Sequence, residues 1–145
     1  MKYELEYYEN GEIKKDYINI DFISNGMLKQ YNNIVSDMMD IKKMWDRISN
    51  LNSIIAANKK EKKNNIGIYK DEINELTEKI KNFNKEDFFK LRFDLLCDIL
   101  SKNLVKNKKY YDYEFWNNDV DSSVLVKFLD EIISKDLSKK KVLNQ

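Results

Sequence analysis

The chain has 145 residues, 42% of them hydrophobic, a length that favours one domain with a single core over two ordinary domains. Its 26 basic and 25 acidic side chains give a formal net charge of +1, which argues against a dedicated nucleic-acid-binding protein, because such proteins usually carry a clear basic excess. The chain has no histidine, which excludes the commonest general base and metal ligand, and its lone Cys97 can form neither an intrachain disulfide nor a cysteine zinc site.

The sequence shows no segment for export or for membrane insertion. The N-terminal stretch MKYELEYYENG has no apolar core like that of a secretory signal, and no window approaches the roughly 18 continuous apolar residues of a membrane span. A lone cysteine also fits a reducing compartment. We therefore expect a cytoplasmic protein that does not contact a membrane.

The first 22 residues are expected to form a β-hairpin. Residues 2–8 alternate large apolar and acidic side chains, which is the period of a half-buried strand. Asn10 and Gly11 are the preferred pair for a two-residue type I′ turn, and a second strand would follow over residues 13–22. A two-stranded ribbon is marginal alone, so it must lie on helices or meet strands of another copy. On one face of the second strand the pattern places Ile18, Ile20 and Phe22.

Residues 24–83 are expected to form an antiparallel hairpin of two long helices. Ser24 offers an N-cap oxygen to the first helix, and apolar residues then recur at three- and four-residue spacing along one narrow seam. A helix of about 35 residues would be roughly 50 Å long at 1.5 Å rise per residue, so the second helix, over about residues 69–83, covers only part of it. The first seam contains Met27, Tyr31, Ile34, Met38, Ile41, Trp45 and Ile48, and the second contains Tyr69, Ile73, Leu76, Ile80 and Phe83.

A lysine-rich segment at residues 59–63 separates the two helices and is followed by Gly67. Such a run usually forms a solvated turn that complements a helix C-terminus. A phosphate or nucleic-acid patch is the alternative, and the sequence leaves the role of this segment open.

Two further helices are expected after the helical hairpin. Residues 88–100 are apolar over a broad face, which indicates a buried helix. Asp121 or Ser122 would cap a fourth helix from about residue 124, while the lysine-rich residues 138–145 are expected to fray. The fold class is therefore mainly α, with an N-terminal β-hairpin, a long antiparallel helical hairpin and two further packed helices. The expected organisation is a single domain over residues 1–137, made up of 1–22, 24–83 and 85–137.

No group of residues points to catalysis or metal binding. Cys97 lies on an apolar helix face without a histidine to activate it, so a core position is the expectation. Asp119 and Asp121 lack the other ligands of a calcium loop, and helix capping explains them. Glu4 and Glu6 share one strand face, which we expect to be the solvent side of the hairpin. We expect no enzyme, no metal site and no cofactor.

The segment over residues 102–116 combines lysines with aromatic side chains. These are the ingredients of a platform on which single-stranded nucleic acid stacks. Tyrosine and tryptophan equally serve a protein interface or a loop packed on the core. The side chains in question are Lys102, Lys106, Lys108, Lys109, Tyr110, Tyr111, Tyr113 and Trp116.

The order of elements and several short motifs resemble the tail assembly chaperones of long-tailed bacteriophages and prophages of Gram-positive bacteria. The resemblance covers the beginning and the C-terminal part of the chain, whereas the long lysine- and asparagine-rich helical hairpin departs from the family pattern. No family residue can therefore be carried onto that hairpin. The motifs are FISNGML at residues 22–28, FFKLRF at 88–93, EFW at 114–116 and LVKFL at 125–129.

The resemblance implies a non-enzymatic, oligomerising protein in the cytoplasm of the bacterial host. It implies binding to the tape measure protein and to tail tube subunits during tail assembly. The alternative is a phage-encoded nucleic-acid-binding or anti-defence protein that uses residues 102–116. For the protein-binding function, the candidate residues are Met38, Ile41, Trp45, Ile48, Phe115 and Trp116.

Overall fold

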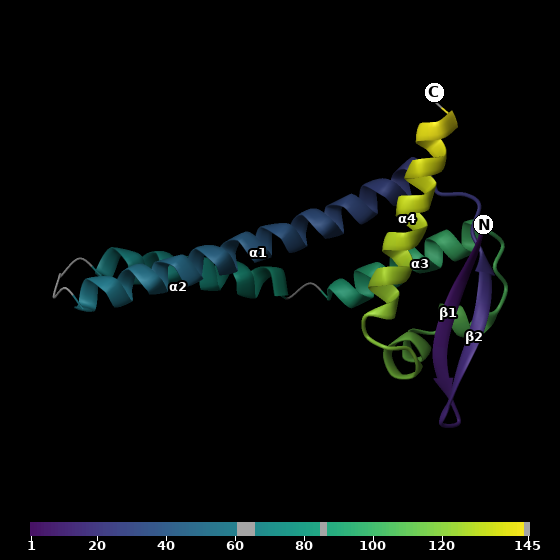
Figure 1. Ribbon diagram of the computed structural model, residues 1–145, viewed down its shortest axis with the longest axis horizontal. Coiled ribbons are helices and arrows are strands. Elements are labelled where there is room, and N and C mark those ends of the chain that lie inside the picture. Colours follow the sequence, from purple (N-terminus) through teal and green to yellow (C-terminus); the bar gives the residue numbers. More distant parts are fainter. Residues whose placement is uncertain (61–65, 85–86, 144–145) are drawn as a thin grey trace. The chain divides into compact units, whose positions relative to one another are not determined.

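The computed structural model describes residues 1–60, 66–84 and 87–143, and the chain divides into two compact units. Unit 1 comprises Met1–Asn32 and Phe88–Gln145, and unit 2 comprises Asn33–Asp87. The elements are mostly helices, and a two-stranded antiparallel hairpin precedes them (Figure 1). The predicted fold class is confirmed, whereas the single domain over residues 1–137 stays a prediction.

The hairpin in unit 1 consists of β1 (Lys2–Glu9) and β2 (Glu12–Asn19). Asn10 and Gly11 join the strands with φ values of 53° and 78°, so both adopt the left-handed conformation that a type I′ turn requires. The predicted turn is therefore confirmed. The register pairs Glu9 with Glu12 at the turn and Lys2 with Asn19 at the open end.

The second strand is shorter than the sequence predicted. It ends at Asn19 and does not reach Phe22, whose ring is exposed and not on the face of Ile18 and Ile20. The physical reason is a different set of hydrogen bonds, because the side chain of Asn103 accepts from the main-chain amides of Asp21 and Phe22. These residues are therefore held as a loop.

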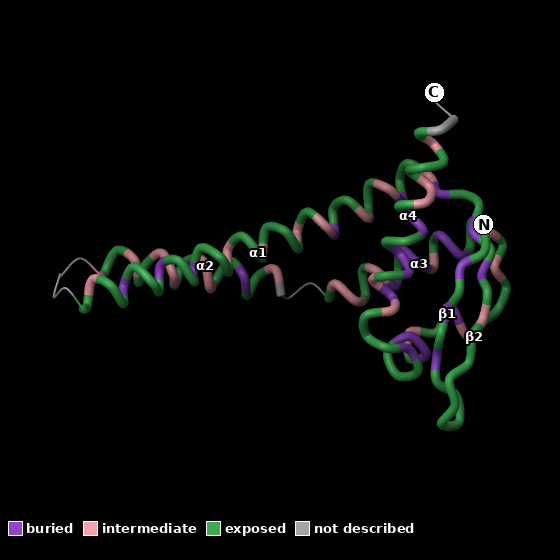
Figure 2. Tube along the Cα trace, in the orientation of Figure 1, coloured by how far each residue is buried: buried purple, intermediate pink, exposed green. Residues whose placement is uncertain are grey.

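The core of unit 1 forms where β1 packs on the C-terminal helices. α3 (Phe88–Lys102) and α4 (Val124–Leu143) supply buried apolar faces, and the edge of the Tyr3 ring meets Phe128 at 6.1 Å between centroids. Buried positions gather on these elements in Figure 2. Burial of each large apolar side chain contributes about 1.5–3 kcal/mol. The most deeply buried members are Leu5, Leu95, Leu96, Ile99, Leu100, Trp116, Leu125, Leu129 and Ile132.

Two short helices connect α3 to α4. The first is a 3₁₀-helix, η1 (Lys108–Tyr111), and the second is a π-helix, η2 (Phe115–Asp119). Asp121 accepts hydrogen bonds from the main-chain amide and hydroxyl of Ser123 just before α4, in agreement with the predicted capping role. α4 then continues to Leu143, so residues 138–143 are helical where fraying was expected.

Unit 2 is a helical pair. The helix α1 (Asn25–Lys60) begins in unit 1, where Ser24 Oγ accepts from the Met27 amide, and it continues unbroken past Asn50. In unit 2 it lies beside α2 (Gly67–Asn84), which runs back along it (Figure 1). Ile48 and Ile80 of the predicted seams are buried here, together with Leu51 and Ile55.

A bidentate ion pair also joins the two helices of unit 2. Arg47 Nε lies 2.9 Å from one carboxylate oxygen of Glu72, and a second guanidinium nitrogen lies 3.2 Å from the other. Lys59 and Lys60 form part of the last turn of α1. The rest of the predicted lysine-rich turn at 59–63 lies outside the described residues. None of the described helices is both long enough and apolar enough to cross a membrane.

Candidate protein-binding surface

The exposed apolar side chains of α1 form the strongest candidate for a functional surface. Trp45 is 52% exposed, Met38 39% and Met39 54%. Ile41 is half-buried and Ile48 is buried. Of the four α1 residues predicted to bind a protein, Met38 and Trp45 therefore reach the solvent, Ile41 does so in part, and Ile48 belongs to the packing of unit 2.

Helix geometry explains why Trp45 is exposed while its neighbours on the seam are buried. Successive residues of an α-helix are about 100° apart, so Ile48 and Leu51 bracket the direction of Ile55, whereas Trp45 points about 60° to one side of Ile48. The buried side chains face α2. Trp45 lies on the flank of the same stripe, where a second molecule can reach its ring.

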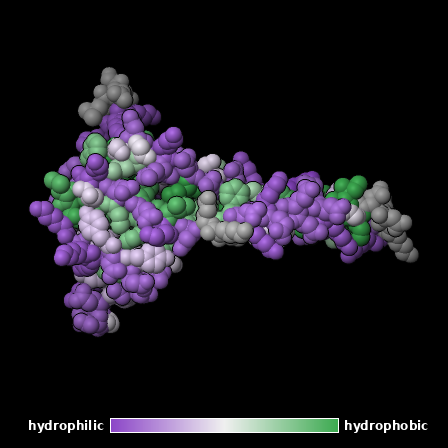
Figure 3. Space-filling view, turned by 180° about the vertical axis from the view of Figure 1, so that it is seen from behind, coloured by the Kyte–Doolittle hydropathy of each residue, from purple (hydrophilic) through white to green (hydrophobic). Residues whose placement is uncertain are grey.

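A shallow hollow lies beside the Trp45 ring on α1. Four of its six lining residues have small or polar side chains, so the large indole stands next to a low region of the helix. On the face shown in Figure 3, most of the helical pair is hydrophilic, and hydrophobic side chains occur in separate patches. We call the hollow beside Trp45 the α1 groove. Its lining residues are Trp45, Ile48, Ser49, Asn52, Ser53 and Ala56.

Phe115 and Trp116, the other two predicted contact residues, lie in the core of unit 1. Trp116 is 1% exposed and its indole N–H donates to the Tyr110 carbonyl at 2.8 Å. Phe115 is 6% exposed and packs edge-on against Tyr7 at 5.4 Å. Neither ring is available to a partner in this conformation, because both are buried in the core of unit 1, so the prediction that they form part of the contact surface is wrong for this structure.

The aromatic rings of the 102–116 segment are also used within unit 1. Tyr110 is buried, and the Tyr111 hydroxyl donates to the Val105 carbonyl. The Tyr113 ring meets Phe93 at 5.4 Å, so these rings do not form an open stacking platform.

One lysine of this segment serves a polar network with the hairpin. Lys109 Nζ lies 2.9 Å from Asp16 Oδ2 and 2.8 Å from the Tyr7 hydroxyl oxygen. Burial and the hydrogen bond that Tyr110 donates to Asp16 raise the pKa of Tyr110 well above its ordinary value. Lys109, one of the four lysines of the predicted platform, is therefore bonded to β1 and β2.

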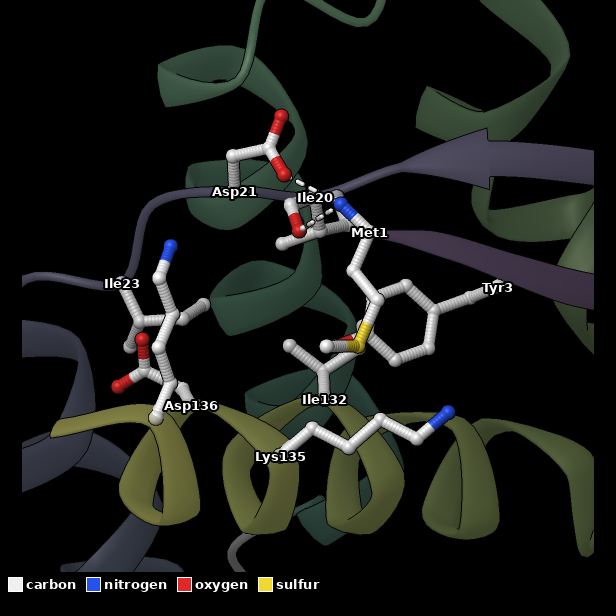
Figure 4. A pocket seen from close by; sticks show the side chains of 9 residues that line it. Met1, Tyr3, Ile20, Asp21, Ile23, Ile132, Lys135 and Asp136 are labelled. Atoms are coloured by element: carbon white, nitrogen blue, oxygen red, sulfur yellow. Dashed lines mark hydrogen bonds and ion pairs between the residues drawn. The ribbon is translucent and has the colours of Figure 1, made fainter. Parts of the chain in front are cut away.

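A cavity of about 280 Å³ lies at the open end of the hairpin in unit 1 (Figure 4). The ammonium group of Met1 bonds to Asp21, while Asp136 pairs with Lys140 at 3.1 Å. Because its carboxylates have cationic partners within unit 1, the cavity shows no free pair of groups for general acid and base catalysis. Its lining residues are Met1, Tyr3, Ile20, Asp21, Ile23, Ile132, Lys135, Asp136 and Lys139.

The residues singled out for chemistry occupy ordinary structural positions. Cys97 is half-buried, and burial together with nearby Asp94 and Asp98 raises the pKa of its thiol, which disfavours a nucleophilic thiolate. Glu4 and Glu6 are exposed, and the Lys15 ammonium lies 3.1 Å from the Glu4 carboxylate and 3.4 Å from the Glu6 carboxylate. Within the described ranges, no group of three or more histidine, cysteine or acidic residues could hold a metal ion.

Sequence reasoning missed Asn103, which organises the end of the hairpin. Its side chain makes four hydrogen bonds in unit 1, two of them to the amides of Asp21 and Phe22. A lone asparagine after a lysine at a helix end is a weak signal, because asparagine is abundant throughout this chain.

Comparisons with known proteins give no relative for this chain. No family model, no curated protein and no solved structure matches it.

Proposed function

We propose that this protein acts by binding another protein, as a tail assembly chaperone that holds the tape measure protein and tail tube subunits during tail morphogenesis in the host cytoplasm. The single observation that supports binding is the exposed Trp45 beside the α1 groove. A tryptophan costs free energy when it is left in water, and tryptophan is enriched among the residues that dominate protein interfaces.

The chemistry of the exposed side chains fits a helical partner. Met38 places a flexible thioether about 20° around α1 from the rigid indole of Trp45, whereas Met39 points about 120° away from it. A flexible thioether adapts to an apolar helix whose side chains differ in size and shape along its length. A tape measure protein exposes long apolar helices before the tail tube encloses them, and covering those helices would prevent their aggregation.

The identity of the partner rests on the sequence resemblance to tail assembly chaperones. The motifs that support it lie in residues 22–28 and in the C-terminal elements of unit 1. Unit 2, which contains Trp45, departs from the family pattern. We therefore propose that unit 2 supplies the partner contact particular to this protein.

Co-expression with the tape measure protein encoded in the same genome tests the proposal. Wild-type protein should keep a tape measure fragment soluble and co-purify with it. Trp45→Ala should reduce the amount of soluble complex about tenfold, the effect of a lost interface residue worth about 1.4 kcal/mol. Phe22→Ala is the matched control, since Phe22 is also 52% exposed but lies in unit 1, and it should have no effect.

Two results would contradict the proposal. One is a tape measure fragment that stays insoluble and does not co-purify with the wild-type protein. The other is equal loss of complex with Trp45→Ala and Phe22→Ala, since that outcome would show that the α1 groove is not the contact surface.

A further inference from the structure

The outer edge of β1 carries main-chain groups that pair with nothing in the part of the chain that the structure describes. The Ile20 amide donates to the Met1 carbonyl at 3.0 Å, which marks Met1 and Ile20 as a hydrogen-bonded pair. Hydrogen-bonded and non-hydrogen-bonded pairs alternate along an antiparallel ladder. The register therefore directs the amides and carbonyls of Glu4 and Glu6 away from β2, toward the open edge.

A groove of about 360 Å³ runs beside this edge, between β1 and one flank of α4 in unit 1. We call it the β1 groove. Val124 and Phe128 give it an apolar floor, and charged side chains stand at its rim. Its lining residues are Glu4, Glu6, Val124, Lys127, Phe128 and Glu131.

The rim charges indicate which kind of strand could enter. Glu4 and Glu6 share one ammonium, that of Lys15, so two carboxylates on the outer face have one cation between them. A second copy of β1 would bring the same two carboxylates to the same edge, and like charges on neighbouring strands repel. A strand with a lysine or arginine opposite Glu4 or Glu6 would meet no such repulsion and would gain an ion pair.

We propose that β1 accepts a third strand from a partner protein, an extended segment in which basic and apolar residues alternate. Its main chain bonds to the free amides and carbonyls at Glu4 and Glu6. Its basic side chains lie beside these two carboxylates on the outer face, and its apolar side chains lie over Val124 and Phe128. The addition of a strand to an exposed sheet edge is a recurrent way of binding peptides, and here it also enlarges a sheet that has only two strands.

A fluorescent nine-residue peptide of alternating valine and lysine is a suitable probe, with the full-length protein and anisotropy as the readout. Wild-type protein should bind it, and a valine–glutamate peptide should bind at least about tenfold more weakly. Only alternate amides of the bound peptide face β1, and the direction of the peptide decides which ones they are. If the peptide runs antiparallel to β1, N-methylation of the lysine amides should abolish binding. If it runs parallel to β1, N-methylation of the valine amides should do so.

Variants of the protein separate the main-chain contribution from that of charge. Glu6→Pro removes an amide that points to the open edge and leaves the bonds to β2 in place, so the hairpin should persist. It should weaken binding of the peptide about tenfold more than Glu6→Gln, which removes the charge alone. Tyr17→Pro is the matched control on the free edge of β2 and should bind as the wild type does, with circular dichroism checking the fold of all three variants.

Four results would overturn the inference. They are no binding of the valine–lysine peptide, equal binding of the valine–glutamate peptide, equal effects of Glu6→Pro and Tyr17→Pro, and full binding of both N-methylated peptides. Light scattering that shows copies of the chain joined through β1, and separated by Glu6→Pro, would overturn it too, because the edge would then belong to a second copy. Trp45→Ala should leave peptide binding unchanged, which keeps this test distinct from that of the α1 groove.

Discussion

The Lys109 ammonium lies 2.9 Å from the Asp16 carboxylate, and this contact attaches the connector before α4 to the β-hairpin. The same ammonium lies 4.2 Å from the centroid of the Tyr7 ring, and Tyr110 donates its hydroxyl to Asp16. Asp16 is thus a half-buried carboxylate with a cation and a phenol as partners.

Replacement of Asp16 by asparagine should destabilise the protein by about 1–3 kcal/mol. Asparagine can still accept from Tyr110, but it leaves the Lys109 ammonium without its carboxylate. Urea unfolding followed by circular dichroism measures the change. Glu12→Gln, an exposed change on the same strand, should leave the free energy of unfolding within about 0.5 kcal/mol of the wild-type value. Equal midpoints for Asp16→Asn and Glu12→Gln would show that the pair adds no stability.

The same carboxylate should make stability depend on pH. Burial alone would raise the pKa of Asp16, but hydrogen bonds from Tyr110 and Lys109 outweigh it, and the pKa lies below its ordinary value of 3.8. A carboxyl whose pKa is lower in the folded state stabilises above its unfolded pKa, and this stability is lost as the pH falls through the folded value. The stability difference between wild type and Asp16→Asn should therefore be full at pH 7 and should shrink as the pH falls below about 4. A difference that stays constant down to pH 2 would contradict this assignment.

Substitution of the two tryptophans should change stability by very different amounts. Trp116 is 1% exposed, so Trp116→Ala should cost about 3–5 kcal/mol through lost burial and the cavity it leaves. Trp45→Ala should cost less than about 1 kcal/mol, because its ring is half in water. Iodide should quench the fluorescence of Trp45 in the Trp116→Phe variant and leave that of Trp116 in the Trp45→Phe variant almost unchanged. Similar quenching of both rings would be inconsistent with the packing of η2.

Local chemistry made some of this structure predictable from sequence. The Asn10-Gly11 turn was predictable because few residue pairs tolerate positive φ at both positions. The long helices were predictable because their apolar spacing has the period of a helix. What could not be predicted was which aromatic rings are buried, since Trp45 and Trp116 look alike in sequence and differ only in what long-range packing places over them.

The loop after β2 shows the same limit. Ile18, Ile20 and Phe22 alternate as a strand should, yet Phe22 is exposed because Asn103, distant in sequence, binds the main chain there. No local pattern carries that information. The candidate surface was foreseen in part for the same reason, because periodicity located the seam of α1 but not the part of it that α2 covers.

The C-terminal end of α3 offers a stabilising substitution. Leu104 has a φ of 58°, and its neighbour Val105 donates to the Leu100 carbonyl at 3.0 Å, the bond of a Schellman motif. A side chain in this left-handed conformation costs about 1–2 kcal/mol, which glycine avoids. Leu104 is also 79% exposed, so little packing is lost. Leu104→Gly should therefore raise the free energy of unfolding by about 0.5–1 kcal/mol. Leu104→Ala keeps the Cβ atom and should not raise it. A loss of stability with glycine would contradict this reasoning.

Asn103 should be the polar side chain of greatest consequence for the end of the hairpin. Its Oδ1 accepts from the amides of Asp21 and Phe22, both at 2.9 Å, while its Nδ2 donates to the carbonyls of Phe22 at 2.9 Å and Ile99 at 2.7 Å. Asn103→Ala takes the side-chain partner from the amides of Asp21 and Phe22 and from the Phe22 carbonyl, whereas the Ile99 carbonyl keeps its bond from the main-chain amide of residue 103. The substitution should cost about 1–3 kcal/mol. Hydrogen exchange adds a local readout, since the amides of Asp21 and Phe22 should lose protection. Asn118→Ala is the control, because Asn118 makes a hydrogen bond of 2.9 Å to Glu114 in water, and it should change stability by less than about 0.5 kcal/mol. If the two variants unfold at the same urea concentration, the loop after β2 does not depend on the Asn103 amide.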